Sequence, residues 1–161
     1  MSQSKLSHVA LAQPSDIAAL EPLFQALYAQ ETPNAAAPDD ATCARHIKRL
    51  LDEETPHDLI IAWGTDGRSL GLVAVARVTS ISDPRPDNWT QIDLKELFVL
   101  PEARGQNIGR ALMEWVQAYA NRKGACRIDW HVKSDNADGI RFYERFGVKV
   151  VNGRLSMRKM L

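Results

Sequence analysis

Residues 94–113 read Leu94-Lys-Glu-Leu-Phe-Val-Leu-Pro-Glu-Ala-Arg-Gly-Gln-Asn-Ile-Gly-Arg-Ala-Leu-Met113, and this stretch decides the fold. Its pattern changes from an apolar strand to a proline-marked turn, then to a loop of small and polar residues, and then to a helix. The first N–H groups of a helix lack partners within it and lie at the positive end of the helix dipole, so they favour an anion. The stretch therefore predicts an anion site where a strand passes into a helix.

Two glycines and two arginines strengthen that prediction. Gly105 and Gly109 place no side chain in the way of a ligand near the backbone, and Arg104 and Arg110 add charge that can meet phosphate oxygens. Known phosphate loops fit poorly, because no Gly-Lys is followed by Ser or Thr and the glycine spacing does not match G-x-G-x-x-G. From the residues alone, a helix entry with surface arginines and no ligand is an equal alternative.

Working outward, helical and strand periods alternate along the whole chain. The predicted strands are residues 8–12, 58–63, 69–78, 91–99 and 125–132, with a last strand or strand pair between Val148 and Met160. The predicted helices are residues 16–30, 39–54, 106–122 and 136–146, the last ended by Gly147 in the left-handed conformation. Residues 64–67 form a hairpin turn and residues 81–89 a loop. This order favours a mixed sheet with helices on both faces.

Composition narrows the possible classes of protein. The chain has 161 residues, which suits a single domain spanning 1–161, and its 20 basic and 20 acidic residues lack the basic excess of nucleic-acid binders. Cys43 and Cys126 form no C-x-x-C pair, so we expect neither a disulfide nor a metal site. The chain begins with a polar segment and has no membrane-spanning run, which predicts a cytoplasmic protein without a membrane partner. Four histidines are interpreted as surface or hydrogen-bonded side chains, namely His8, His46, His57 and His131.

Two motifs then resemble a known family. Phe98-Val-Leu-Pro-Glu-Ala-Arg-Gly-Gln-Asn-Ile-Gly-Arg-Ala-Leu112 resembles motif A of the GNAT superfamily of N-acetyltransferases, whose signature is Arg/Gln-x-x-Gly-x-Gly/Ala. Arg104, Asn107 and Gly109 occupy the signature places, with Asn107 where the family usually has Gly. Because Asn tolerates left-handed backbone better than most residues, we expect the loop to keep its shape. Asn136-Ala-Asp-Gly-Ile-Arg-Phe-Tyr-Glu-Arg-Phe-Gly147 resembles motif B.

The resemblance implies an α/β fold, α+β by some schemes: the acyl-CoA N-acyltransferase fold, with a mixed, mostly antiparallel central sheet flanked by helices on both faces. It also implies acetyl-CoA as co-substrate and no metal. Backbone groups of Leu97, Phe98 and Val99 would pair with the pantetheine arm like an added strand. The pyrophosphate would be held by the N–H groups of Arg104, Gly105, Gln106, Asn107, Ile108, Gly109 and Arg110. Asn136 would hydrogen-bond the pantetheine or its neighbouring backbone, and a helix N-cap is a comparable expectation for it.

Acetyl transfer to an amine also needs a group that protonates the leaving thiolate. The resemblance implies that Tyr143 stands near the thioester sulfur, and a phenol, with an ordinary pKa of about 10, carries a proton at neutral pH. A core aromatic on a helix face, with its hydroxyl in solvent, is the alternative for Tyr143.

The base is sought on the strand at 91–99. Glu96 has the same parity as Ile92, Leu94 and Phe98, so it is predicted to be a carboxylate in an apolar row and a candidate base, direct or through a water. A solvated or salt-bridged glutamate is the alternative, and a bulge in the strand would spoil the parity argument. Asp93 is a weaker candidate. The amide of Val99 is a candidate for polarising the thioester carbonyl.

These observations predict an acetyl-CoA-dependent N-acetyltransferase acting on a primary amine of a small molecule or peptide by direct attack on the thioester. Trp130-His131-Val132 resembles the polyamine and thialysine acetyltransferase subgroup, but Lys95 stands where that subgroup usually has an acidic residue, which argues against a polycation. The first helices and the loop at 84–89 would form the acceptor wall.

Three alternatives stay open: a sensor or scaffold that binds acetyl-CoA without turnover, an unrelated phosphate-binding α/β domain, and transfer of a longer acyl group or to an oxygen acceptor. A homodimer formed through sheet edges is one option by analogy.

Overall fold

The structure is a computed structural model that describes residues 4–153 and 156–161. Its residue contacts divide the chain into two compact units, unit 1 at Met1–Trp130 and unit 2 at His131–Leu161. The prediction of one domain over 1–161 stays a prediction. Each unit is described by itself.

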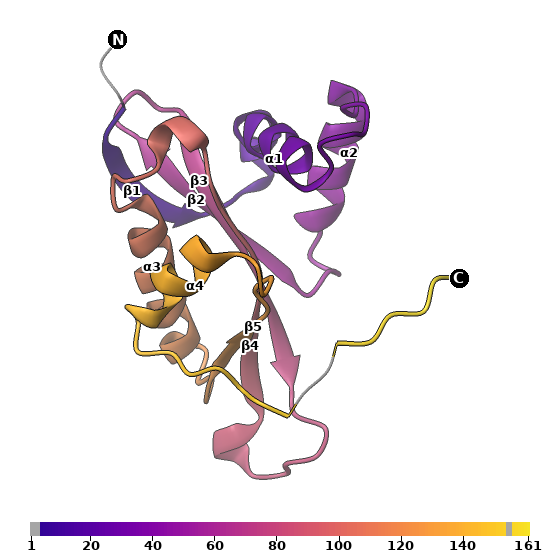
Figure 1. Cartoon of the computed structure of the whole chain (residues 1–161), viewed down its shortest axis with the longest axis vertical. Helices are drawn as coiled ribbons and strands as arrows, with labels where there is room; N and C mark the ends of the chain where they lie inside the picture. The colour runs from indigo at the N-terminus through magenta and orange to yellow at the C-terminus, as the bar shows by residue number, and fades with distance from the viewer. Residues whose placement is uncertain (1–3, 154–155) are drawn as a thin grey trace. The chain divides into compact units, whose positions relative to one another are not determined.

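Unit 1 is built on a sheet of five strands in the order β1-β2-β3-β4-β5 (Figure 1). The strands are β1 (Leu6–Leu11), β2 (His57–Gly64), β3 (Ser69–Thr79), β4 (Thr90–Val99) and β5 (Ile128–Trp130). The first four pair antiparallel, and β5 pairs in parallel with β4. This confirms the mixed, mostly antiparallel sheet. The hairpin turn is confirmed as well, with Gly67 at a φ of 78°.

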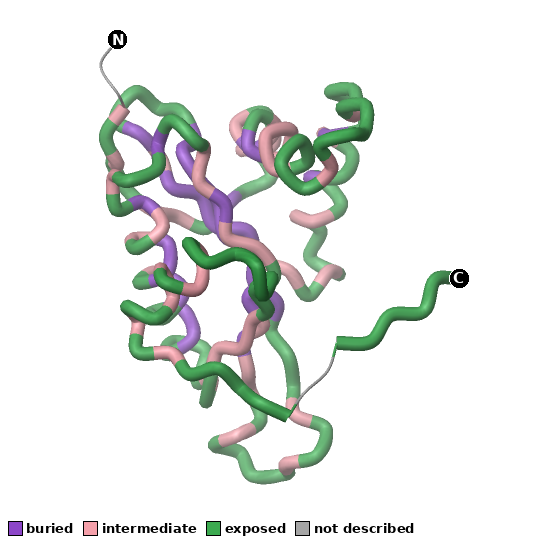
Figure 2. The backbone as a smooth tube through the Cα atoms, in the orientation of Figure 1, coloured by how far each residue is buried: buried purple, intermediate pink, exposed green. Residues whose placement is uncertain are grey.

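Helices cover both faces of this sheet. Helices α1 (Ile17–Glu31) and α2 (Asp40–Leu50) pack on one face, and α3 (Ile108–Arg122) packs on the other (Figure 1). Successive strand residues point to opposite faces, so each apolar strand feeds both layers. Leu59, Ile61 and Leu72 join the α1–α2 core, and Ile60 and Val73 point the other way, all almost fully buried. The buried backbone accordingly follows the strands in Figure 2.

A bulge in β4 corrects the parity argument for Glu96. Ala74 of β3 faces Glu96, but the next residue, Val75, faces Leu94, so Lys95 is the extra residue on β4. Because one extra residue reverses the alternation, Leu94 lies on the α3 face with Val75, whereas Glu96 lies on the α1–α2 face with Ala74. The predicted apolar row Ile92, Leu94, Glu96 and Phe98 is therefore wrong, and only Phe98 shares the face of Glu96.

Several predicted boundaries move for local reasons. The second helix stops at Leu50 instead of residue 54, since Asp52 accepts from Glu54 N at 3.0 Å and Thr55 Oγ1 donates to Leu50 O at 3.1 Å. Such side-chain bonds compete with further helical turns. The third helix begins at Ile108 instead of residue 106, because Asn107 is left-handed. Strand β5 has three residues instead of the eight at 125–132, since it pairs only with Ile92–Leu94 before the bulge.

Unit 2 consists of α4 (Ala137–Glu144) and its flanking segments. The helix is shorter than the predicted 136–146, because Asn136 is its N-cap and the chain turns at its end into Gly147, at a φ of 69° as predicted. The predicted strand between Val148 and Met160 is not found in residues 148–153 or 156–160, and residues 154–155 lie outside the described part. Val150 and Val151 favour a strand locally, but they are 80% and 61% exposed, and strand propensity is expressed only on a packed, paired surface.

In the described part of the chain, no helix combines the length and the apolar character needed to cross a membrane.

Candidate active site

Strand β4 has an open edge next to the bulge. Strand β5 pairs with Ile92, Asp93 and Leu94, and the pairing recorded on that edge within unit 1 ends there. Leu100 N donates to Leu70 O of β3 at 3.0 Å, and backbone groups of successive residues alternate in direction. Leu97 and Val99 therefore direct their N–H and C=O groups away from β3. Phe98 directs its own toward β3, with its carbonyl beside Gly71, which corrects the expectation that Phe98 would also offer backbone groups at this edge. Such an edge can accept an extended ligand as an added strand.

The open edge leads directly into the helix entry, which we define as residues 104–110. Asn107, at a φ of 63°, is the one non-glycine residue with positive φ in the described ranges, which confirms the expectation that it would adopt the conformation usual for glycine. Gly105 has a φ of 78°. The first intrahelical bond runs from Ala111 N to Asn107 O, so the N–H groups of residues 108–110 have no acceptor inside α3. N–H groups of this kind at the start of a helix favour an anion, and the anion site itself stays a prediction.

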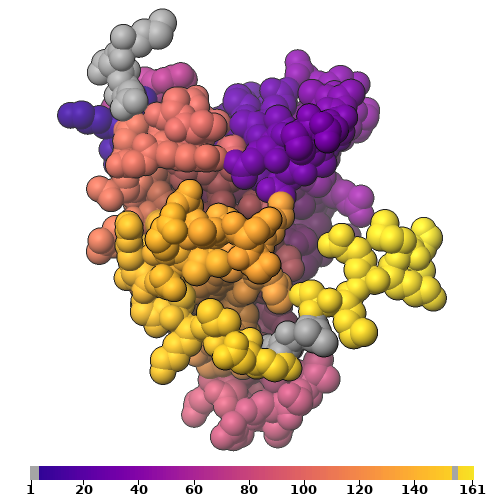
Figure 3. Space-filling view, viewed as in Figure 1, coloured from indigo at the N-terminus to yellow at the C-terminus, as the bar shows by residue number. Residues whose placement is uncertain are grey.

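The two arginines of the helix entry contact protein groups. Arg104 Nε donates to Val99 O at 3.1 Å, and its guanidinium donates to Gln30 Oε1 of α1 at 2.7 Å. The same guanidinium lies 6.0 Å from the Phe98 ring centroid. Arg110 pairs with Glu114 one turn along α3 at 2.8 Å. Figure 3 shows the resulting contact between the violet atoms of α1 and the salmon atoms of the chain around residues 100–110.

A close approach of backbone holds the strands together behind this edge. A Cβ atom on Gly71 of β3 would lie 2.8 Å from Phe98 O and 3.2 Å from Val99 Cγ2. Glycine at this place lets β3 approach the end of β4, just before the chain turns into α3. A side chain at residue 71 would push β3 away from the end of β4, so the position of the open edge depends on Gly71.

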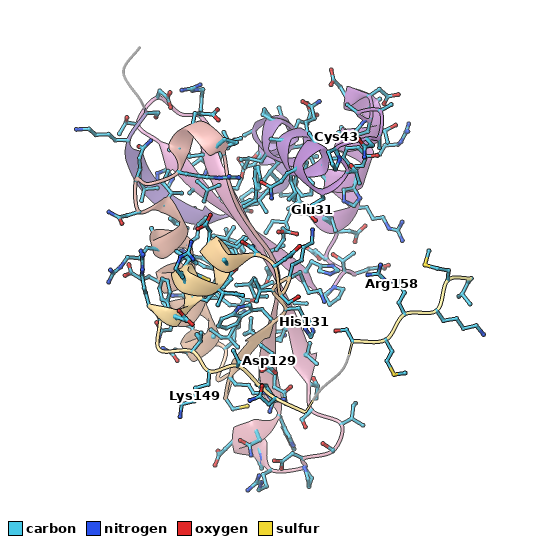
Figure 4. The ribbon with its side chains drawn as sticks, viewed as in Figure 1. Glu31, Cys43, Asp129, His131, Lys149 and Arg158 are labelled. Atoms are coloured by element: carbon cyan, nitrogen blue, oxygen red, sulfur yellow. The ribbon has the colours of Figure 1, made fainter. Side chains whose placement is uncertain are left out.

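The second feature is a pocket of about 240 Å³ on the α1–α2 face of the sheet, which we call the apolar pocket. Six of its lining side chains are apolar and come from two helices and two strands: Phe24, Leu27, Leu50, Leu59, Leu72 and Ala74. Its polar lining residues are His57, Lys95 and Glu96. Helices α1 and α2 line the pocket, no residue of the loop at 84–89 is among its lining residues, and the acceptor wall stays a prediction. In Figure 4 the helix pair can be found from two labelled residues, Glu31 at the end of α1 and Cys43 on α2. Burial raises the pKa of the Cys43 thiol.

The polar side of the apolar pocket includes a histidine whose surroundings differ from the sequence-based expectation. His57 was interpreted as a surface or hydrogen-bonded histidine, but its Nδ1 is buried and has no hydrogen-bond partner within the described part of the chain. Lys95 Nζ pairs with Asp93 Oδ2 at 2.9 Å, so the carboxylate of the weaker base candidate already neutralises the lysine. A histidine two residues before the apolar run Leu59–Ala62 was the available signal, but the sequence did not show what it would face.

In unit 2, α4 carries Asn136 and Tyr143. The Asn136 side chain accepts from Gly139 N at 2.9 Å, so it is a helix N-cap, one of its two predicted roles. A Cβ on Gly139 would lie 2.5 Å from Asn136 Nδ2, which explains a glycine inside the first turn. Tyr143 is half-buried, and its ring packs edge-on to Phe142 with centroids 5.2 Å apart.

No group of three or more His, Cys, Asp or Glu side chains suited to holding a metal ion occurs among residues 4–153 and 156–161.

Comparison with known proteins identifies the family. The profile of the Acetyltransferase (GNAT) family matches residues 20–148. An uncharacterised N-acetyltransferase of Mycobacterium tuberculosis is 31% identical over 134 residues, which covers 78% of either chain. The aminoalkylphosphonate N-acetyltransferase of Salmonella typhimurium is 39% identical over 62 residues, or 38% of this chain and 40% of that protein. Because the profile covers most of the chain, the protein belongs to the Acetyltransferase (GNAT) family.

Solved structures agree on the fold. An integron cassette protein from the mobile metagenome of V. cholerae superposes with a TM-score of 0.84 at 23% identity, over 95% of this chain and 91% of that chain. The chain spans less than half the length of three of the curated relatives it matches, from Methanocaldococcus jannaschii, Streptomyces lavendulae and S. typhimurium. What those proteins act on is therefore not carried over to this chain.

Proposed function

We propose that this protein is an acetyl-CoA-dependent N-acetyltransferase that moves an acetyl group to a primary amine of a small molecule or peptide. The observation that carries the proposal is the continuous path from the open edge of β4 to the helix entry. An extended chain pairing with Leu97 and Val99 has its anionic end at the N–H groups of residues 108–110. Acetyl-CoA has this form, with amide groups along an arm that ends in a pyrophosphate.

The residues present fit that group. Asn107 holds the left-handed turn that precedes the N–H groups without a helical acceptor. Among the described residues, the Val99 carbonyl accepts a side-chain hydrogen bond from Arg104 alone. Arg104 would exchange its bond to Val99 O for one to the ligand. The pyrophosphate is assigned to the N–H groups of residues 105–110, since Arg104 N, which the resemblance also implied, already donates to Pro101 O at 3.3 Å. Asn136 is assigned to the pantetheine or to backbone beside it. The bound thioester supplies the activated acetyl group.

The chemistry requires the chain to move two protons. A carbon–nitrogen bond forms between the acceptor amine and the thioester carbonyl carbon as the carbon–sulfur bond breaks, so the amine loses a proton and the thiolate gains one. We assign the acceptance of the amine proton to Glu96, directly or through a water, since it lines the apolar pocket. Tyr143 is assigned the protonation of the thiolate, and the Val99 amide the polarisation of the carbonyl.

Two features support an enzyme over a sensor or scaffold of the same fold. Tyr143 supplies an acid, and the apolar pocket supplies a place for a second substrate, which a protein that only binds acetyl-CoA does not need. We further propose that the chain acts as one cytoplasmic domain without a nucleic-acid partner, in keeping with its 20 basic and 20 acidic residues. A homodimer is not required by any of these roles.

Calorimetric titration of acetyl-CoA tests the proposal. The wild type is expected to bind in the micromolar range and Gly109→Trp not to bind, because the indole would occupy the helix entry. Ala118→Trp, an exposed position of the same helix, is the matched control and is expected to bind like the wild type. ATP and NAD should not compete. A folded wild type that does not bind acetyl-CoA would refute the proposal.

A second measurement separates enzyme from sensor. Tyr143→Phe should bind acetyl-CoA like the wild type and release thiol from acetyl-CoA about 100-fold more slowly with a competent amine, the usual scale for loss of a general acid. Unchanged turnover in Tyr143→Phe would remove the acid role, and binding without any turnover across amines would favour the sensor.

A further inference from the structure

Three contacts of the Arg104 side chain tie the end of β4 to helix α1. Its Nε donates to Val99 O at 3.1 Å, and a terminal nitrogen of the same guanidinium donates to Gln30 Oε1 at 2.7 Å. The guanidinium also lies 6.0 Å from the ring centroid of Phe98. Because its donors point in fixed directions, a planar guanidinium can bridge two acceptors in this way. The link joins two elements of unit 1 that are far apart in the sequence.

The backbone that carries Arg104 is held in place on both sides. Ala103 is 2% exposed, Arg104 N donates to Pro101 O at 3.3 Å, and Gly105 follows at a φ of 78°. The side chain itself is exposed. Exposed side chains change rotamer within picoseconds to nanoseconds, so the guanidinium can leave Val99 O by rotation of its own torsions. Release of the link therefore needs no movement of β4 or of the helix entry.

The contact with Val99 lies where an added strand would pair. The C=O group of Val99 points away from β3, and it is the group that Arg104 Nε occupies. An extended ligand that adds to this edge brings an N–H group to the same oxygen. The guanidinium and the ligand therefore compete for one acceptor, and pairing of the ligand requires that the guanidinium moves.

Gln30 favours the position in which the edge is covered. It is the partner on α1 of a charged donor, and hydrogen bonds from charged groups are stronger than those between neutral groups. Gln30 belongs neither to the open edge nor to the helix entry. When a ligand binds only to the fraction of molecules with an uncovered edge, its apparent affinity is reduced by that fraction. A residue outside the cofactor site can therefore control the affinity of that site.

We propose that Gln30 and Arg104 form a latch that covers the open edge of β4 and lowers the affinity for acetyl-CoA. This inference rests on the proposed acetyl-CoA site and concerns its regulation by helix α1. Arg104 leaves Val99 O when an extended ligand pairs with the edge, and Gln30 loses its partner at the same time. A substitution on α1 that removes the hydrogen bond to Arg104 strengthens acetyl-CoA binding, although it adds no contact with the ligand.

The first experiment is a calorimetric titration of the 161-residue chain with acetyl-CoA. Gln30→Leu removes the amide acceptor and keeps a side chain of similar size, so the affinity is expected to rise about threefold to tenfold. Gln117→Leu, at an exposed glutamine of α3, is the matched control and should bind like the wild type. Unchanged or weaker binding by a folded Gln30→Leu would overturn the inference. A folded wild type that does not bind acetyl-CoA would instead refute the proposed function, and the latch with it.

Rate constants separate a latch from a residue that holds Arg104 against the ligand. For a latch, Gln30→Leu should raise the association rate constant by about the same factor as the affinity, with the dissociation rate constant within about twofold of the wild type. Surface plasmon resonance on the immobilised chain measures both rate constants. Faster dissociation without faster association would show that Gln30 supports the bound form, and would overturn the inference.

An Arg104→Met background tests whether Gln30 acts through Arg104. This variant has no donor for the Gln30 amide, so adding Gln30→Leu should change its acetyl-CoA affinity by less than about twofold. Gln30→Glu supplies a charged acceptor and should lower the affinity about threefold when Arg104 is present, and less in Arg104→Met. Equal effects of Gln30→Leu in the two backgrounds would show that Gln30 acts independently of Arg104, and the latch would be wrong.

Discussion

The helix entry follows β4 along the chain and the apolar pocket includes two residues of that strand, Lys95 and Glu96, but the two regions are built from different parts of the polypeptide. At the helix entry the groups without an acceptor inside α3 are the backbone N–H groups of three consecutive residues, 108–110. In the apolar pocket the lining groups are side chains from two helices and three strands. The first arrangement depends on the φ angles of a few residues, and the second on the volumes of side chains that lie far apart in the sequence.

The difference indicates how each region should respond to substitution. A helix entry tolerates changes of side chain that keep its left-handed residue, whereas a pocket responds to each methylene gained or lost. Arg104 is a side-chain link between the end of β4 and helix α1, because it donates to both Val99 O and Gln30 Oε1. The following predictions separate the two regions, from the largest expected effect to the smallest.

The largest loss of stability is expected at a pocket residue that also belongs to the core. Leu72 is 1% exposed and lines the apolar pocket, so Leu72→Ala should lower the free energy of unfolding by about 2–5 kcal/mol. Denaturant unfolding measures this loss, and amine kinetics should show a raised KM. Acetyl-CoA affinity should change little, because the groups assigned to acetyl-CoA are backbone groups, although Leu72 itself pairs with Phe98 across the sheet. A large loss of acetyl-CoA affinity would show that the helix entry and the apolar pocket are not built separately.

A calibration comes from the far end of α3, on the opposite face of the sheet from the apolar pocket. The Tyr119 hydroxyl donates to the Asp58 carboxylate, and Tyr119 is 5% exposed. Tyr119→Phe leaves that carboxylate without its donor and should cost about 1–3 kcal/mol of unfolding free energy. Acetyl-CoA affinity and amine KM should both stay unchanged. A change in acetyl-CoA affinity or in amine KM would show that a loss of stability by itself affects binding. The changes measured for Leu72→Ala would then have to be compared with those of Tyr119→Phe.

The same tyrosine gives the wild type a dependence on alkaline pH. Burial and the Asp58 carboxylate raise the pKa of Tyr119 from its ordinary 10.0 to about 12. Because the folded state holds this proton more tightly, the stabilisation is complete below about pH 10 and is lost as pH rises toward 12. The free energy of unfolding, measured from pH 9 to pH 12, should fall in the wild type and should fall less in Tyr119→Phe. An equal dependence of the free energy of unfolding on pH in the two proteins would contradict this assignment to Tyr119.

The smallest effect on stability is expected at the helix entry. Asn107→Val places a branched side chain at a φ of 63° and should cost about 1–2 kcal/mol, with acetyl-CoA affinity reduced as the N–H groups shift. Asn107→Gly is the matched control, since it removes the side chain and keeps the conformation. Differential scanning calorimetry and acetyl-CoA titration check both variants. If Gly weakened binding as much as Val, the Asn107 side chain would have a direct role and the helix entry would not be built from backbone alone.

The sequence by itself determined the helix entry and most of the fold. The apolar periods predicted each α-helix and the five observed strands, and the left-handed conformation of Asn107 was expected because Asn107 stands where motif A usually has Gly. Such features depend on residues within a few positions of one another, whose backbone preferences are set by local sterics and hydrogen bonds. Family membership was accessible for the same reason, because motif A is one continuous stretch.

Tertiary structure alone decided the side of the sheet on which Glu96 lies, the surroundings of His57 and the absence of a strand from the described residues after Val148. The bulge at Lys95 becomes visible only in the register between β3 and β4, and one extra residue reverses every side chain that follows. The apolar pocket joins residues from 24 to 96, so no local pattern contains it. Local preference fixes how a short segment bends, and packing between distant segments fixes what its side chains face.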